Sequence, residues 1–182
     1  MLLLWDMPLL TVGHSNRPIE EFLGILRAHG VEVMADVRTV PRSRHNPQFN
    51  REALAVSLAE AGIGYIHMPA LGGLRSPRKD SINTGWRNPS FRAYADYMQT
   101  AEFAQALVEL LRLARERRVA AMCAEAVPWR CHRSLIADAA AARGWEVEHI
   151  LAAGATNPHR MTAFARVDDE RVAYPAEEGD LF

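Results

Sequence analysis

Short apolar segments alternate five times along the chain with stretches whose apolar residues recur at helical spacing. The expected strands cover residues 9–12, 31–37, 65–68, 119–123 and 145–151. This alternation favours parallel strands, because parallel neighbours must be joined by crossover connections. The sequence therefore predicts an α/β fold, a single doubly wound (Rossmann-like) domain with a mainly parallel sheet of about five strands.

The rest of the chain fits around that core. A length of 182 residues suits one domain, so we expect 1–182 to be a single domain with a core at about 8–152. The irregular stretch 70–90 is expected to be a long loop, either a lid or a binding loop or a mobile excursion. Residues 153–182 are expected to form a small C-terminal β-hairpin and a tail.

Composition limits the classes of function. The formal net charge of −1 excludes a generally basic surface for nucleic acid, so any anion site must be local. Two cysteines do not make a disulfide framework, which favours a reducing compartment with functional or buried thiols. The apolar start, residues 1–5, is too short for a signal-peptide core or a membrane span. We expect a cytoplasmic protein with no membrane contact.

Polar residues gather where the predicted strands end. In a parallel sheet the carboxyl ends of the strands share one edge, and ligands bind there. The segments 13–17, 36–38 and 123–133, together with His67, follow four different strands. The sequence therefore predicts that they converge on one pocket.

These segments also carry a family resemblance. The motifs are Thr11-Val12-Gly13-His14-Ser15-Asn16, Asp36-Val37-Arg38, Leu71-Gly72-Gly73 and Cys123-Ala124-Glu125 running to Cys131-His132-Arg133. Together they resemble the bacterial and archaeal domain of unknown function family 488 from about residue 10 to residue 182. The resemblance implies fold and membership, and it implies no activity, because none is established for that family.

Three residues are candidates for catalysis. Cys131 lies near an expected helix start beside Arg130 and His132, where positive groups favour a thiolate nucleophile; the alternative is a small buried apolar residue. Glu125 is a candidate general acid or base, or else a helix cap or an ion-pair partner. His14 follows a strand, where an imidazole can bind a ligand or transfer a proton.

Anion binding is the expected task of the arginines. Arg38 and Arg133 are the first candidates, because a guanidinium beside a helix N-terminus suits phosphate or carboxylate. The alternative is internal pairing with Asp36 and Glu125. The other candidate ligand-binding residues are Arg42, Asp36, Ser15, His132 and Arg130. No metal site is expected from the cysteine and histidine spacing, and no cofactor, because no dinucleotide or P-loop motif follows a strand.

Three classes of function stay open. The first is an enzyme, a transferase or hydrolase, that binds a small phosphorylated or nucleotide-like ligand at the carboxyl edge of the sheet. The second is a nucleic-acid-associated protein of DNA repair or modification, with Phe49, Trp86, Phe91 and Tyr94 available for stacking. In that class the last four residues, 179–182, resemble the end of the peptide by which bacterial repair proteins bind the sliding clamp. The alternative for these four residues is an ordinary apolar tail. The third is a non-catalytic interaction module.

Overall fold

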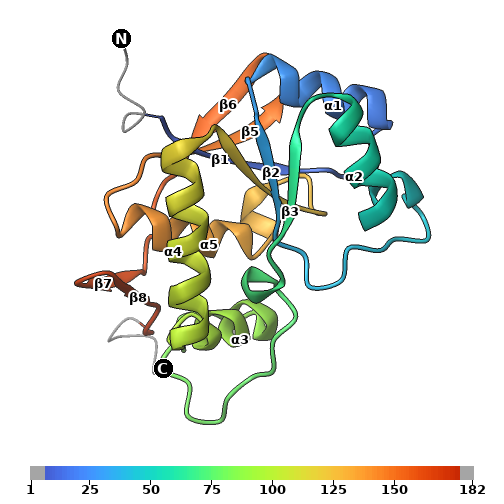
Figure 1. Cartoon of the computed structure of the whole chain (residues 1–182). Helices are drawn as coiled ribbons and strands as arrows, with labels where there is room; N and C mark the ends of the chain where they lie inside the picture. The colour runs from blue at the N-terminus through green and yellow to red at the C-terminus, as the bar shows by residue number, and fades with distance from the viewer. Residues whose placement is uncertain (1–6, 177–182) are drawn as a thin grey trace.

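The computed structural model describes residues 7–176, and its centre is a six-stranded sheet (Figure 1). The strands are β1 (Leu9–Gly13), β2 (Val33–Asp36), β3 (Gly64–His67), β4 (Val119–Cys123), β5 (Val147–Ala152) and β6 (Ala155–Pro158). Their order is β3-β2-β4-β1-β5-β6, and β6 alone runs antiparallel to its neighbour, β5. The predicted α/β fold with a mainly parallel sheet is confirmed, and β6 is a strand that was not predicted.

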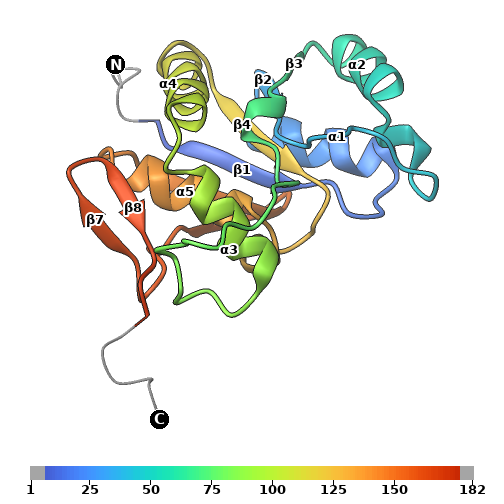
Figure 2. The same cartoon turned by 90° about the horizontal axis from the view of Figure 1, so that it is seen from below.

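Helices cover both faces of this sheet. They are α1 (Ile19–Ala28), α2 (Arg51–Glu60), α3 (Pro89–Tyr97), α4 (Ala101–Glu116) and α5 (Arg133–Ala141). Alternate strand residues point to opposite faces, so Leu10 and Met34 pack with α1 and α2, whereas Leu9 and Ala35 pack with α3, α4 and α5. Figure 2 shows the two helix groups on opposite sides of the strands.

The strand order fixes where a ligand can enter. The connections that follow β1 and β2 pass over the α1 and α2 face, whereas the one that follows β4 returns over the α5 face. β4 lies between β1 and β2 in the sheet. The connection after β4 runs toward β5, which is opposite to the direction of the connections after β1 and β2. A crevice opens at such points in α/β sheets, and here it lies beside the carboxyl end of β4.

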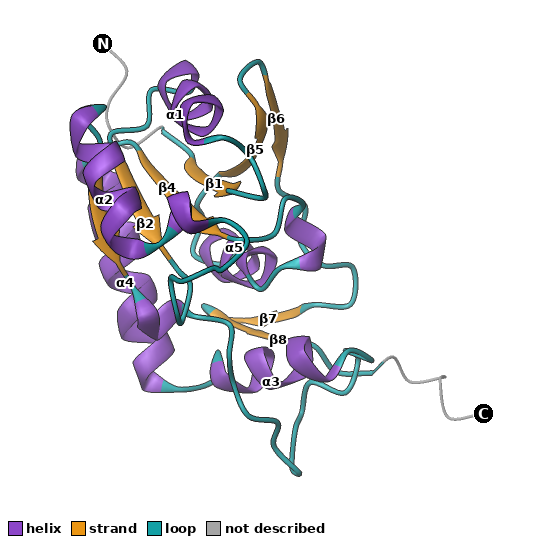
Figure 3. Cartoon of the chain, turned by 90° about the vertical axis from the view of Figure 1, so that its right-hand side faces the viewer, coloured by secondary structure: helices purple, strands orange, loops and turns teal. Residues whose placement is uncertain are grey.

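The expected long loop is held to the C-terminal hairpin. The hairpin consists of β7 (Arg166–Asp168) and β8 (Arg171–Ala173), as predicted, and Figure 3 shows it beside α3. Asn83 is fully buried; its side chain accepts a hydrogen bond from the Tyr174 N–H (2.9 Å) and donates one to Asp96 (2.8 Å). These bonds anchor the 70–90 segment at its centre.

Two further sequence predictions concern a sliding-clamp contact of the chain end and the absence of membrane contact. The proposed sliding-clamp contact falls on 179–182, outside the described residues, so it stays a prediction. Within 7–176, no helix is both long enough and apolar enough to cross a membrane.

Candidate functional site

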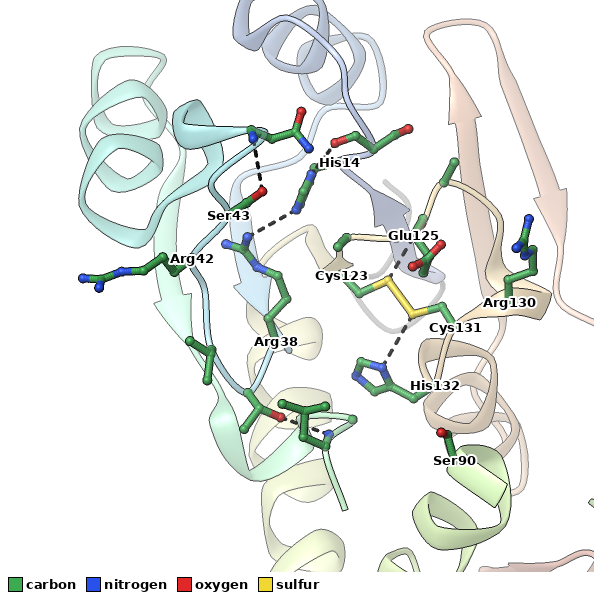
Figure 4. Close-up of a pocket in the computed structure, with 18 of the residues that line it drawn as sticks. His14, Arg38, Arg42, Ser43, Ser90, Cys123, Glu125, Arg130, Cys131 and His132 are labelled. Atoms are coloured by element: carbon green, nitrogen blue, oxygen red, sulfur yellow. Dashed lines mark hydrogen bonds between the residues drawn. A yellow bond between two sulfur atoms is a disulfide. The ribbon is translucent and has the colours of Figure 1, made fainter. Parts of the chain in front are cut away.

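The crevice beside β4 holds a pocket of about 730 Å³. Most of the residues that line the pocket follow β1, β2 and β4, and residues 73–74 and 90–91 complete the lining (Figure 4). The predicted site residues that line it are His14, Ser15, Arg38, Arg42, Glu125, Arg130, Cys131 and His132. Asp36 and Arg133 do not line the pocket, although both contact residues that do.

Asp36 and Arg38 form an internal ion pair. The Asp36 carboxylate is fully buried and accepts hydrogen bonds from Arg38 Nε (2.8 Å), Arg38 Nη2 (2.6 Å) and the Tyr65 hydroxyl (2.7 Å). One edge of the guanidinium, formed by Nε and Nη2, is thus occupied by the carboxylate, and Nη1 donates to His14 Nε2 (3.2 Å). Internal pairing therefore explains Arg38 better than the expected anion contact does, and Asp36 has no direct access to a ligand.

His14 is also fully engaged. Its Nδ1–H donates to the Ser15 carbonyl (2.7 Å), and its Nε2 accepts from Arg38 Nη1 (3.2 Å). The ring stacks on Phe49 with centroids 4.2 Å apart, and burial lowers the pKa of His14 to about 4. A neutral ring with both nitrogens hydrogen-bonded positions Arg38, and the catalytic role expected from the sequence stays a prediction.

Arg133 lies behind the pocket wall. Its side chain is fully buried, and it donates to the carbonyls of Glu125 (2.9 Å) and Ala126 (3.1 Å) and to Cys123 Sγ (3.0 Å). Burial lowers the pKa of Arg133 to about 10. Arg133 therefore holds the segment 124–126 in position, and the ligand contact expected from the sequence stays a prediction.

Gly13 allows the end of β1 to pass against that same segment. A Cβ atom at residue 13 would overlap the Glu125 carbonyl and lie 2.7 Å from Arg133 Nη1. The strand end is fastened there by bonds from His14 N–H to the Cys123 carbonyl (3.0 Å) and from Ser15 N–H to the Ala124 carbonyl (2.9 Å). Ser15 itself adopts a left-handed backbone with φ 54°. The sequence signal for this close approach was a glycine at a strand exit.

Cys123 and Cys131 are joined by a disulfide on the pocket floor (Figure 4). This differs from the expected free thiols, and a sulfur in a disulfide is not a nucleophile. Cys131 Sγ accepts the backbone N–H of Arg133 at the start of α5 (3.5 Å), which is the helix-start position that the sequence predicted. His132 Nδ1 lies 3.6 Å from the same sulfur.

His132 is oriented by the end of β2. Its Nε2–H donates to the Val37 carbonyl (3.1 Å), and burial lowers its pKa to about 4. A neutral ring with this tautomer carries no hydrogen on Nδ1, so the lone pair of Nδ1 faces Cys131. In the reduced protein the Nδ1 atom would be in position to accept the Cys131 thiol proton, the arrangement that activates a cysteine nucleophile.

The other three charged side chains predicted for the site form no bonds within residues 7–176 of the protein. Glu125, Arg42 and Arg130 are exposed at the pocket, and none of the three side chains makes a hydrogen bond or ion pair with another residue of the described part. In Figure 4 Arg42 points outward, whereas Glu125 lies near the disulfide. Two apolar residues that were not predicted line the same pocket, Val40 and Leu74, which are 61% and 74% exposed.

The described residues contain no group of three or more histidine, cysteine or acidic side chains placed to hold a metal ion. His67, the fourth expected strand-end residue, is bonded through Nε2 to the Arg38 carbonyl (2.8 Å). It supports the backbone of the 38–46 loop.

Fold and site together define an α/β protein with a charged pocket at the carboxyl edge of a mainly parallel sheet. The family model described as "Domain of unknown function DUF488" matches residues 18–140, and the chain belongs to this family. Neither curated proteins nor solved structures give a match.

Proposed function

We propose that the protein binds a small phosphorylated or nucleotide-like anion in the carboxyl-edge pocket and acts on it as a transferase or hydrolase. The observation that carries this proposal is the set of three unpartnered charges at the pocket, Arg42, Arg130 and Glu125. All three residues line a single cavity, with Glu125 near the disulfide and the Arg42 side chain pointing outward. Two guanidinium groups supply anion recognition, and one carboxylate supplies proton transfer.

The engaged residues support the same proposal by making the pocket rigid. Arg38, Asp36 and His14 are joined by hydrogen bonds on one wall, and Arg133 fixes the backbone of 124–126 on the other. Catalytic groups act best when their supporting residues are locked in place. Glu125 is therefore the proposed acid or base, and His14 and Arg133 are positioning residues.

A cytoplasmic location is also part of the proposal. Cytoplasmic thiols are kept reduced, so the Cys123–Cys131 pair would be a dithiol there. His132 Nδ1 would then face the Cys131 thiol, and this pair would add a nucleophile to the pocket.

A second candidate is a non-catalytic module that binds the same kind of ligand. It is favoured by the number of predicted catalytic groups that are engaged internally, His14 through both ring nitrogens and Cys131 through the disulfide. The two candidates differ in whether Glu125 takes part in turnover.

The test uses isothermal titration of the full chain with ribose 5-phosphate and inorganic phosphate. Arg130→Ala and Arg42→Ala should each weaken binding by about tenfold, the loss expected for one charge-assisted contact. Glu125→Gln should strengthen phosphate binding, because it removes a negative charge from the pocket. The matched control is Arg27→Ala, which removes an exposed arginine from α1 outside the pocket.

The result that contradicts the proposal is unchanged phosphate affinity in both pocket variants, or an equal loss in the Arg27 variant. The non-catalytic candidate is separated by product analysis of the bound phosphate ester. Slow conversion that Glu125→Gln abolishes supports the enzyme, and retention of the intact ester by both proteins supports the module.

A further inference from the structure

A second pocket, of about 440 Å³, lies on the other side of the turn η4 (Pro128–Arg130). Arg130 lines the first pocket, whereas Pro128 and Trp129 line the second. Trp86, in the second pocket, and Phe91, in the first, have ring centroids 4.8 Å apart. The two pockets are therefore neighbours with shared walls.

Trp129 is the unusual residue of the second pocket. It is 66% exposed, and within residues 7–176 it makes no ring contact with another aromatic side chain. Trp86 differs, because it packs against Phe91, Phe164 and Tyr174 in the core. A large planar ring left exposed at a cavity is a surface on which another flat ring can stack.

Polar groups suited to a nucleobase edge lie beside that ring. The Asn157 amide and the Arg160 guanidinium line the pocket and are exposed, and neither side chain has a hydrogen-bond or ion-pair partner among the residues the structure describes. An amide offers both donors and an acceptor to a base edge, and a guanidinium offers a fork of donors. Together with Trp129 they supply stacking, edge recognition and positive charge.

The histidines of this pocket form its rigid back wall. Buried Asp138 accepts from His159 Nε2 (2.8 Å), His159 Nδ1 pairs with His149 Nε2 (3.0 Å), and His149 Nδ1 pairs with the Thr11 hydroxyl (2.6 Å). All four ring nitrogens of His149 and His159 are therefore hydrogen-bonded. These histidines are thus unavailable as a metal site or an acid–base pair, which leaves Trp129 and the polar rim as the binding groups.

The turn between the pockets links them chemically. Trp129 and Arg130 are consecutive in a 3₁₀ turn, where neighbouring side chains diverge by roughly 120°. Trp129 thus lines the second pocket, while Arg130 lines the first.

We propose that the second pocket receives the base of a nucleotide unit, stacked on Trp129, whose phosphate lies in the first pocket beside Arg130. This inference rests on the proposed function and specifies its ligand. It also changes the stacking residues expected from the sequence, since Phe49 and Tyr94 are fully buried and cannot stack on a ligand. The unit is recognised either as a free nucleotide or within a single strand.

The experiment measures binding of four probes to the full chain by titration and by tryptophan fluorescence. The probes are ribose 5-phosphate, adenosine, adenosine 5′-monophosphate and a single-stranded adenine hexadeoxynucleotide. The mononucleotide should bind more tightly than ribose 5-phosphate or adenosine alone. Trp129→Ala should weaken binding of the base-bearing probes about 5- to 100-fold and leave ribose 5-phosphate unchanged.

Two variants make this result specific. Trp129→Phe keeps an aromatic ring and should retain most of the affinity. Val108→Ala removes an exposed apolar side chain from α4 and should change nothing. A hexanucleotide that binds much more tightly than the mononucleotide, with a strong salt dependence, identifies a nucleic-acid strand as the source of the unit; equal affinity identifies a free nucleotide.

Failure of this inference differs from failure of the proposed function. Equal affinity of wild type and Trp129→Ala for every base-bearing probe overturns the base subsite, while ribose 5-phosphate binding would still support the anion pocket. Binding of adenosine that Trp129→Ala removes, with no binding of ribose 5-phosphate, overturns the anion pocket and keeps the stacking site. No binding of any probe at millimolar concentration overturns both.

Discussion

Three histidines should make the protein strongly sensitive to mild acid. Burial lowers the pKa of His14, His132 and His149 from 6.5 to about 4. Between these two pKa values the unfolded chain therefore binds protons that the folded protein does not bind. Their contribution to stability is complete above pH 6.5 and is lost as the pH falls from there toward 4.

The magnitude follows from these pKa values. Each histidine lowers the free energy of unfolding by about 2 kcal/mol at about pH 5 relative to neutral pH. Near pH 5.5 the three take up about 2.6 protons on unfolding, so the free energy of unfolding should fall by roughly 3.6 kcal/mol per pH unit. Since natural domains have about 5–15 kcal/mol in total, such a slope brings acid unfolding close to pH 5.

The assay is urea unfolding followed by circular dichroism between about pH 5 and pH 7.5. His14→Asn keeps a donor near the Ser15 carbonyl and removes one titrating group, so the slope should fall by about a third. The control, His45→Asn, replaces an exposed histidine and should leave the slope unchanged. An unchanged slope in His14→Asn, or a wild-type slope below about 1.4 kcal/mol per pH unit, would refute the reasoning.

Two further predictions concern the walls of the carboxyl-edge pocket. Gly13→Ala should destabilise the protein by about 1–3 kcal/mol and abolish phosphate binding, because its Cβ would overlap the Glu125 carbonyl. The control, Gly24→Ala, lies in open space within α1 and should instead stabilise the protein by about 0.4–1 kcal/mol. Equal shifts of the urea midpoint in the two variants would count against the close approach at Gly13. Arg133→Met should cost about 0–3 kcal/mol. Two charge-assisted bonds to carbonyls are worth roughly 1.5–3 kcal/mol each, and relief of the burial that lowers the pKa of Arg133 to about 10 returns about 3 kcal/mol. If the Arg133→Met protein were more stable in the same urea assay, the buried guanidinium would lower the free energy of unfolding overall, which contradicts the prediction.

The fold was largely predictable because its elements have strong local patterns. β1 and β4 are fully buried apolar runs, and α4 has an apolar stripe that matches its buried face. β6 was missed for a physical reason. Ala155–Pro158 is mostly exposed and has no apolar alternation, so pairing with β5 makes it a strand, and pairing is a tertiary effect.

The site was predictable in location but not in detail. Strand ends could be placed on one edge from topology alone, and that brought His14, Arg38, Glu125 and Cys131 to one pocket. Which arginine is engaged depends on distances that a sequence does not contain. Arg38 and Arg130 are equally charged, yet only Arg38 lies against a buried carboxylate.

This difference between engaged and unengaged arginines decides how a ligand can gain affinity. An anion that recruited the Arg38 fork would leave Asp36 charged, buried and without its partner, and breaking a buried pair costs about 3–5 kcal/mol. An anion that binds Arg130 displaces no protein partner within the described chain. Binding energy should therefore come from Arg130 in the turn 128–130 and from Arg42, whereas His14, Asp36 and Arg38 at the ends of β1 and β2 should set only the shape of the cavity. Substitutions in that turn are then expected to change ligand preference, whereas substitutions of Asp36 or Arg38 should lower stability before they alter specificity.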